Sequence, residues 1–398
     1  MKKFISAISL TIFLLMLTVV TAGAAVVVDG VTYDTKHDDT GATVFFVKEV
    51  DQDLVGEVKL DEKTVGIYAN AFDGCDMITK IILPERLETI GDYAFAGANI
   101  ESIEIPSRVT AIGEGIFTEC TSLREISLPE GITSIGDMAF AYCEELQKIS
   151  LPSGLTSIGE LAFAYCESLT ELSIPESVTD IGDNAFSCTA IKDITIPPGV
   201  TNMGICLFQE CNSLTSATVY ANSISIGTFY DCPALTDVFI MKNLKNISEG
   251  AFSNTNISNV YYEGTKEEFD AVTVDNSGEL NNDGFIGAAK YYNYPDSYTI
   301  ENISVQSAAG ETLSEPPVNE AFIIKADVSE NTSENAEEYL FAALYDKGGA
   351  LLGIYEAKPD NAEFKIPAQT AEIGAAEVFV WRSLAQMRPL AESKSIEW

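Results

Sequence analysis

Histidine is almost absent from the sequence, which has a single one, His37, among 398 residues. A Ser–His triad, a Cys–His pair or a two-histidine metal site would depend on that residue or cannot exist. Basic residues are also scarce, since 23 Lys and Arg stand against 60 Asp and Glu, a formal charge of −37. Nucleic acids and anionic membranes are bound through basic surfaces. The composition therefore argues against both partners and fits a self-repelling extracellular chain.

The N-terminus has the layout of a signal peptide. Lys2 and Lys3 precede an apolar run of 17 residues, 4–20, and Ala22-Gly23-Ala24 has the small-x-small pattern of a cleavage site. We expect residues 1–24 to be removed and the chain to be secreted. A retained membrane anchor is the alternative, and the short run with small residues directly after it favours cleavage. No second long apolar run follows, so we expect no membrane insertion of the mature chain.

An internal repeat occupies most of the chain. A phenylalanine recurs every 21–23 residues, and a leucine or isoleucine follows it five or six residues later. A short alternating run comes next, and a proline closes six of the units. One unit cannot bury its apolar side alone, so the units must stack and bury columns of like residues. The phenylalanines are Phe72, Phe95, Phe117, Phe140, Phe163, Phe186, Phe208, Phe229 and Phe252.

Each part of the unit has a predicted role. The alternating run predicts a short strand with its apolar side chains inward, and the proline ends it because proline lacks the N–H that a ladder needs. The recurring glycine, as in Gly136 and Gly159, suggests a tight backbone bend. Three units lose one residue before Ile100, Ile191 and Ile257, and we expect this loss to leave the strand stack intact.

The pattern resembles the BspA-type leucine-rich repeat of bacterial surface proteins, in about nine copies over residues 65–265. The resemblance implies a β-rich, curved solenoid with a role in adhesion or host interaction. Units near the ends depart from the pattern, since Tyr68, Ser225 and Ser248 replace the glycine. Such worn units are typical of the ends of a stacked array.

The flanks of the repeat predict three further parts. Alternating runs over residues 25–64 predict a β-hairpin cap, and residues 266–296 predict a C-terminal cap and linker. Six or seven short alternating runs over residues 297–398 predict an all-β sandwich domain. Residues 378–390 resemble the end of a small sandwich module that is appended to many secreted clostridial proteins.

Seven of the eight cysteines are expected to share one buried column of the repeat. Neighbouring coils ~4.8 Å apart are within disulfide reach, but side chains stacked in register point the same way, and seven is an odd number. We predict buried free thiols, with disulfides or metal binding as alternatives, and Cys206 stands off the column. The seven are Cys75, Cys120, Cys143, Cys166, Cys188, Cys211 and Cys232.

The outward positions of the strands form the candidate partner-binding face. This column is a hydroxyl ladder that turns aromatic at its C-terminal end, where we expect recognition to centre. In a neighbouring column, Glu125, Lys148 and Glu171 should sit as opposite-charge cross-strand pairs. The plainer interpretation is a solvated β-surface. The candidate column is Ser127, Ser150, Ser173, Thr195, Thr218, Phe239 and Tyr261.

A second candidate is the pair Tyr142 and Tyr165, which occupy one position in adjacent repeats. We expect the two rings to stack at the rim of the coils, where they could anchor a protein or a sugar ring. Partial packing against the next loop is the alternative.

No catalytic site, metal or cofactor is predicted. A glycosidase needs two carboxylates facing each other across a cleft, and carboxylates scattered along outer columns provide none. Residues 275–284 faintly resemble calcium loops, but their spacing fails the EF-hand pattern. The sequence predicts a secreted or cell-surface, non-enzymatic protein whose repeat face contacts a protein of a host or neighbouring cell. A carbohydrate-binding accessory protein is the alternative, and the oligomeric state stays open.

Overall fold

The structure is a computed structural model that describes residues 25–278, 280–292, 298–307, 312–313, 316, 321–330, 339–347, 351–357, 363–366, 373–381 and 394–397. The predicted signal peptide over residues 1–24 lies outside them. The chain divides into two compact units. The first extends to Phe239 and includes Asn243–Asn259 and Val272–Ala288; the second holds Ile240–Lys242, Val260–Ala271 and Ala289–Trp398.

A three-stranded antiparallel meander opens the first unit, where the sequence predicted a simple hairpin. It consists of β1 (Ala25–Val28), β2 (Val31–His37) and β3 (Thr43–Val50). β3 then pairs in parallel with β5 (Thr64–Ile67), which belongs to the first coil. The meander therefore supplies the strand partner that the first coil would otherwise lack.

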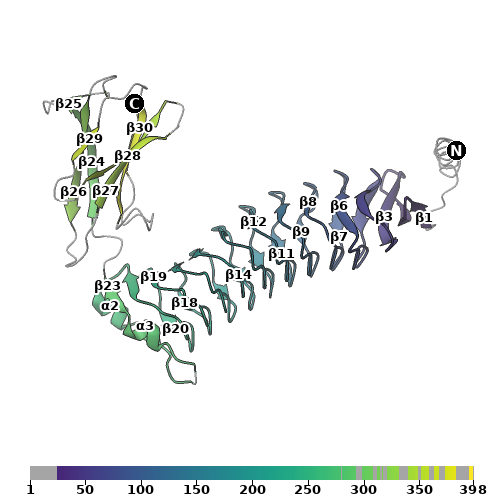
Figure 1. The fold of residues 1–398 in the computed structure, drawn as a ribbon, viewed down its shortest axis with the longest axis horizontal. Helices are drawn as coiled ribbons and strands as arrows, with labels where there is room; N and C mark the ends of the chain where they lie inside the picture. The colour runs from purple at the N-terminus through teal and green to yellow at the C-terminus, as the bar shows by residue number, and fades with distance from the viewer. Residues whose placement is uncertain are drawn as a thin grey trace. The chain divides into compact units, whose positions relative to one another are not determined.

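The repeats form a stack of coils with two rows of short parallel strands (Figure 1). In-register pairs such as Glu125–Lys148 and Ser134–Ser157 show that equivalent residues of successive units lie side by side. The row called the strand face contains β4 (Gly56–Lys59), β6 (Ile78–Ile82), β8 (Ser102–Glu104), β10 (Glu125–Ser127), β12 (Lys148–Ile149), β15 (Asp193–Ile196), β17 (Ser216–Val219), β19 (Asp237–Ile240), β21 (Asn259–Tyr262) and β23 (Ala289–Tyr291).

The second row runs through the Ile-Gly segments and holds mostly two-residue strands. Besides β5, it consists of β7 (Thr89–Ile90), β9 (Ala111–Ile112), β11 (Ser134–Ile135), β13 (Ser157–Ile158), β14 (Asp180–Ile181), β16 (Asn202–Met203), β18 (Ser223–Ile224), β20 (Asn246–Ile247) and β22 (Thr273–Val274).

The repeat phenylalanines form one continuous buried stack, as the sequence predicted. All nine have no exposed surface, and successive ring centroids lie 5.2–5.6 Å apart. Phe285 extends the stack by one ring, 4.7 Å from Phe252. The sequence did not predict this tenth member, because it follows Phe252 by far more than one repeat length.

The repeat glycines have a different role from the predicted tight bend. A Cβ atom at Gly182 would lie 2.4 Å from the backbone nitrogen of Glu160, and one at Gly136 would lie 2.7 Å from the carbonyl carbon of Gly113. Neither glycine has a left-handed backbone. Glycine is required at these positions because successive coils approach too closely for any side chain.

Asn282 closes the C-terminal end of the first unit. Its side chain is buried and replaces the backbone of a further coil: Oδ1 accepts from the Phe252 N–H at 2.9 Å, and Nδ2 donates to the carbonyls of Ser248 and Asp275. The short helix α3 (Asp283–Gly287) then buries Phe285. These three backbone groups thus have the partners that a further coil would have supplied.

The second unit contains helix α2 (Lys266–Asp270), which begins with a capping box between Thr265 and Glu268. The elements described in its C-terminal region are all β-strands, as predicted. The strands form two four-stranded antiparallel sheets in the orders β25-β24-β26-β29 and β28-β27-β30-β31, an arrangement compatible with a sandwich. They are β24 (Tyr298–Ser307), β25 (Thr312–Leu313), β26 (Phe322–Glu330), β27 (Tyr339–Asp346), β28 (Leu351–Ala357), β29 (Glu363–Ile366), β30 (Ile373–Trp381) and β31 (Lys394–Glu397).

Candidate binding surface

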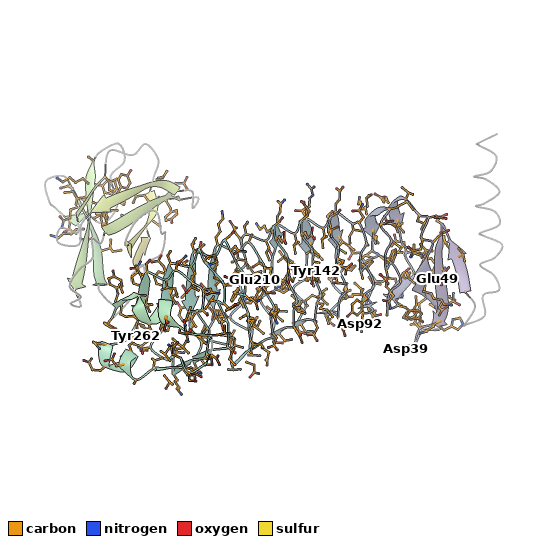
Figure 2. The ribbon with its side chains drawn as sticks, turned by 60° about the horizontal axis from the view of Figure 1, so that its bottom comes forward. Asp39, Glu49, Asp92, Tyr142, Glu210 and Tyr262 are labelled. Carbon is orange, nitrogen blue, oxygen red and sulfur yellow. The ribbon has the colours of Figure 1, made fainter. Side chains whose placement is uncertain are left out.

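Every repeat has a left-handed residue two positions after its phenylalanine. The backbone φ there is between +55° and +67° in all nine units, and in the first eight the N–H donates to the next coil, as from Tyr142 to the Ala164 carbonyl at 2.8 Å. We call this set the rim row; Tyr142 and Glu210 mark it in Figure 2. It consists of Gly74, Gly97, Glu119, Tyr142, Tyr165, Cys188, Glu210, Asp231 and Asn254.

Tyr142 and Tyr165 form a stacked, exposed pair within the rim row. The ring centroids are 4.6 Å apart with planes at 7°, which confirms the predicted stack. The side chains are 45% and 36% exposed. The neighbouring Cys188 raises the pKa of the Tyr165 phenol, so this hydroxyl stays protonated at neutral pH and can donate a hydrogen bond.

Cys188 belongs to the rim row, and its predicted place in the buried cysteine column is wrong. The position three residues after Phe186 is taken by Thr189, which is only 3% exposed and lies 3.2 Å from the Cys211 sulfur. Cys188 itself is half-buried. Burial and the nearby Glu210 carboxylate raise the pKa of its thiol to about 11, which disfavours the reactive thiolate.

The other six cysteines of the predicted column are buried, and all eight cysteines are free. Five of these six thiols, all except that of Cys75 in the first coil, donate to the carbonyl of a phenylalanine in the preceding coil, as from Cys143 to Phe117 at 3.1 Å. Burial raises the pKa of Cys120 to about 12. The column serves packing, since a small side chain with one weak donor fits beside the phenylalanine stack. The buried row is Cys75, Ala98, Cys120, Cys143, Cys166, Thr189, Cys211, Cys232 and Thr255.

The structure divides the predicted hydroxyl and aromatic column into two parts. Its first four members are exposed, and its last three are not: Thr218, Phe239 and Tyr261 have only 9%, 7% and 3% of their surface accessible. An exposed aromatic platform at Phe239 and Tyr261 is therefore a wrong prediction. For Tyr261, the reason is Tyr291 in β23, whose ring stacks on it at 5.0 Å. The exposed members are Ser127, Ser150, Ser173 and Thr195.

The strand face is interrupted between β12 and β15. Residues 171–174 form no strand, although the repeat pattern continues through them. Gln147 donates to the Arg124 carbonyl, but among the described residues no equivalent bond joins Thr170 to Gln147. Glu125 faces Lys148 in register, as predicted. The predicted pairing of Lys148 with Glu171 is wrong, because the ladder is absent there.

Shortened repeats also disturb the strand face more than expected. The strands of the units shortened before Ile100 and Ile191 are not paired with the strand segment of the preceding unit, whereas the unit shortened before Ile257 keeps its place beside β19. A shorter turn shifts the start of a strand relative to its neighbour. At the first two positions backbone bonds from Glu101 to Thr79 and from Lys192 to Thr170 still join the segments, so the coils stay stacked although the strand ladder is lost.

A hollow of about 610 Å³ opens at the interruption. Leu172 is half-buried within it, whereas the equivalent Ile149 and Ile194 are buried in their own strands. Hydroxyl groups of Ser150 and Ser173 also line the hollow. No sequence signal marked this feature, because residues 169–174 have the same alternation as their neighbours.

The loop over residues 275–284 uses its polar groups internally. Asp275 accepts from the Ser277 hydroxyl, and Asp283 accepts from the Asn276 amide. Throughout the described ranges, no group of three or more His, Cys, Asp or Glu is arranged to hold a metal ion. His37 is exposed at the end of β2. None of the described helices has the length and apolarity that a bilayer crossing requires.

The chain is similar to several solved structures, among them two that are described as leucine-rich proteins. A leucine-rich repeat protein from Bacteroides ovatus is 23% identical over 63% of this chain and 88% of its own, with a TM-score of 0.33. A leucine rich cell surface protein from Faecalibacterium prausnitzii is 16% identical over 65% of this chain and 99% of its own, with a TM-score of 0.41. The pneumococcal vaccine antigen PcpA is 17% identical over 64% and 96%, with a TM-score of 0.30.

No curated protein matches the chain. The family model described as BspA type Leucine rich repeat region (6 copies) matches residues 52–170 and 156–281, more than half of the sequence. This match spans the coils, the phenylalanine stack and the rim row. The chain belongs to the BspA-type leucine-rich repeat family, whose repeats imply a binding or adhesion role.

Proposed function

We propose that the protein is a secreted or cell-surface, non-enzymatic binding protein that attaches to a protein partner through the rim row. The stacked pair Tyr142 and Tyr165 carries this proposal. The two rings are exposed, stacked on adjacent coils and available at their edges and hydroxyl groups. Tyrosine is among the residues that most often dominate protein interfaces.

Stability does not account for tyrosine at these two positions. A left-handed backbone disfavours a residue with a side chain by roughly 1–2 kcal/mol, and the first two repeats place Gly74 and Gly97 there. One aromatic stack contributes only about 0.5–1.5 kcal/mol. Two strained tyrosines therefore gain little for folding, which supports a role in recognition.

The geometry of the pair favours a protein over a glycan. A sugar ring stacks on an open aromatic face, and here each ring covers one face of the other. The exposed edges and the two hydroxyl groups suit the mixed apolar and hydrogen-bonding contacts of a protein surface. Glu119, Glu210 and Asp231 share the row, so a partner with a basic surface would be complementary.

To test the proposal, the chain 25–398 is immobilised and exposed to two panels, one of purified extracellular proteins and one of polysaccharides. The amount of each panel member that the chain captures is measured. We expect one or more proteins to bind. The double variant Tyr142→Asn, Tyr165→Asn should weaken that binding at least about tenfold. Asn tolerates the left-handed backbone, so the coils should stay folded. Tyr220→Asn, at a tyrosine that is 38% exposed and lies outside the rim row, is the matched control. Capture of glycans alone would instead support the carbohydrate-binding alternative.

A further inference from the structure

We propose that the hollow on the strand face is a second recognition site, distinct from the rim row. Its occupant is a short extended segment of a protein that presents an apolar side chain flanked by one acidic and one basic side chain. The hollow has a volume of about 610 Å³ and lies on three successive coils. Volumes of this order are typical of sites that enclose a small ligand or a few residues of a peptide.

Three charged side chains at the hollow lack an ionic partner. Lys148, Glu171 and Lys192 line it and are exposed. None of them makes an ion pair within the described part of the chain. Two of them are positive and one is negative, and Asp193, which also lines the hollow, adds a second negative charge, so a ligand with charges of both signs would find a counter-charge for each.

The base of the hollow is apolar. Leu172 would be buried if the ladder were continuous, because its equivalents Ile149 and Ile194 are only 5% and 1% exposed. At the interruption it stays half-buried. An apolar side chain of a ligand would remove this exposed surface from water.

Backbone N–H groups at the interruption lack the acceptors that a paired strand would supply. The N–H groups of residues 171–174 have no backbone acceptor within the described ranges. Together with the hydroxyl groups of Ser150 and Ser173, they can pair with the amides of an extended segment. No aromatic residue lines the hollow, so it lacks the flat ring on which a sugar would stack, and this favours a peptide.

The experiment measures binding of short acetylated and amidated peptides to chain 25–398. Each peptide has a central Leu flanked by Asp and Lys, by two Asp, by two Lys or by two Ser. We expect the Asp and Lys peptide to bind at least about tenfold more tightly than the Ser peptide. Lys148→Glu with Lys192→Glu should remove this preference and favour the peptide with two Lys.

Two further variants keep the result decisive. Ser173→Trp should fill the hollow and abolish peptide binding, whereas Tyr142→Asn with Tyr165→Asn should leave it unchanged. Circular dichroism and the unfolding midpoint check that each variant is folded. Equal binding of all four peptides, binding insensitive to the hollow variants, or binding lost in the tyrosine variant would each overturn the proposal. The rim row proposal does not depend on the hollow, so it would survive either equal binding of all four peptides or binding that is insensitive to the hollow variants.

Discussion

Two adjacent positions of every repeat, the rim row and the buried row, have opposite environments. Cys166 is completely buried among the coils, whereas Cys188 is half-buried beside Tyr165. The buried row accepts only Cys, Ala or Thr, since its space is set by the phenylalanine stack. The rim row changes from Gly to Glu, Tyr, Cys, Asp and Asn although its backbone never changes. One position thus maintains the fold, and its neighbour is free to specify a partner.

Removing a ring from the buried stack should have the largest effect. Phe163→Ala leaves a cavity between Phe140 and Phe186, whose rings lie 5.2 and 5.6 Å from it. We expect the free energy of unfolding to fall by about 3–5 kcal/mol. Urea titration followed by circular dichroism measures it, and a loss below about 1 kcal/mol would contradict a tightly packed stack.

Adding one methyl group between coils should have the next largest effect. A Cβ at residue 159 would lie 2.5 Å from the backbone nitrogen of Asp137, so we expect Gly159→Ala to destabilise the protein by about 1–3 kcal/mol. Gly154→Ala is the matched control, because its Cβ would meet nothing closer than 3.9 Å. Equal unfolding midpoints for the two variants would show that close approach does not explain the glycine.

A substitution in the rim row should barely change stability. Tyr165→Asn removes one stacking contact and relieves left-handed backbone strain, so we expect the free energy of unfolding to change by less than about 1 kcal/mol. The same urea titration measures this. A loss comparable with that of Phe163→Ala would place Tyr165 in the structural core.

The smallest effect is chemical and leaves the fold intact. In the native protein, the alkylation rate of Cys188 should rise with pH up to about 11, because burial and Glu210 raise its thiol pKa above the ordinary 9.0. Glu210→Gln should shift the rate profile to lower pH by removing the negative charge. Mass spectrometry of iodoacetamide-treated protein identifies the site. Faster labelling of Cys166 than of Cys188 would reverse the assignment of the two rows.

The sequence predicted the parts of the fold that depend on repetition. The phenylalanine stack follows from spacing alone, and the contact between Tyr142 and Tyr165 follows from their equal position in adjacent units. Cys188 was misplaced because its unit lacks one residue before Ile191, and Thr189 is also small enough for the buried row. Residue type alone could not decide between the two.

Features that depend on distant segments had no local signal. Tyr261 is covered by Tyr291, thirty residues later, and that contact requires β23 to join the strand face. The interruption at residues 171–174 has the same alternation as paired strands. Gly74 and Gly97 were the available clue to the left-handed rim row, since glycine often marks positive φ.

The most direct test of the separation between the two rows is a paired measurement on the variant with Tyr142→Asn and Tyr165→Asn. Capture of the protein partner and the free energy of unfolding would be measured on the same preparation. The separation predicts capture reduced at least about tenfold, with stability changed by less than about 2 kcal/mol. Undiminished capture, or unfolding of the coils, would contradict it.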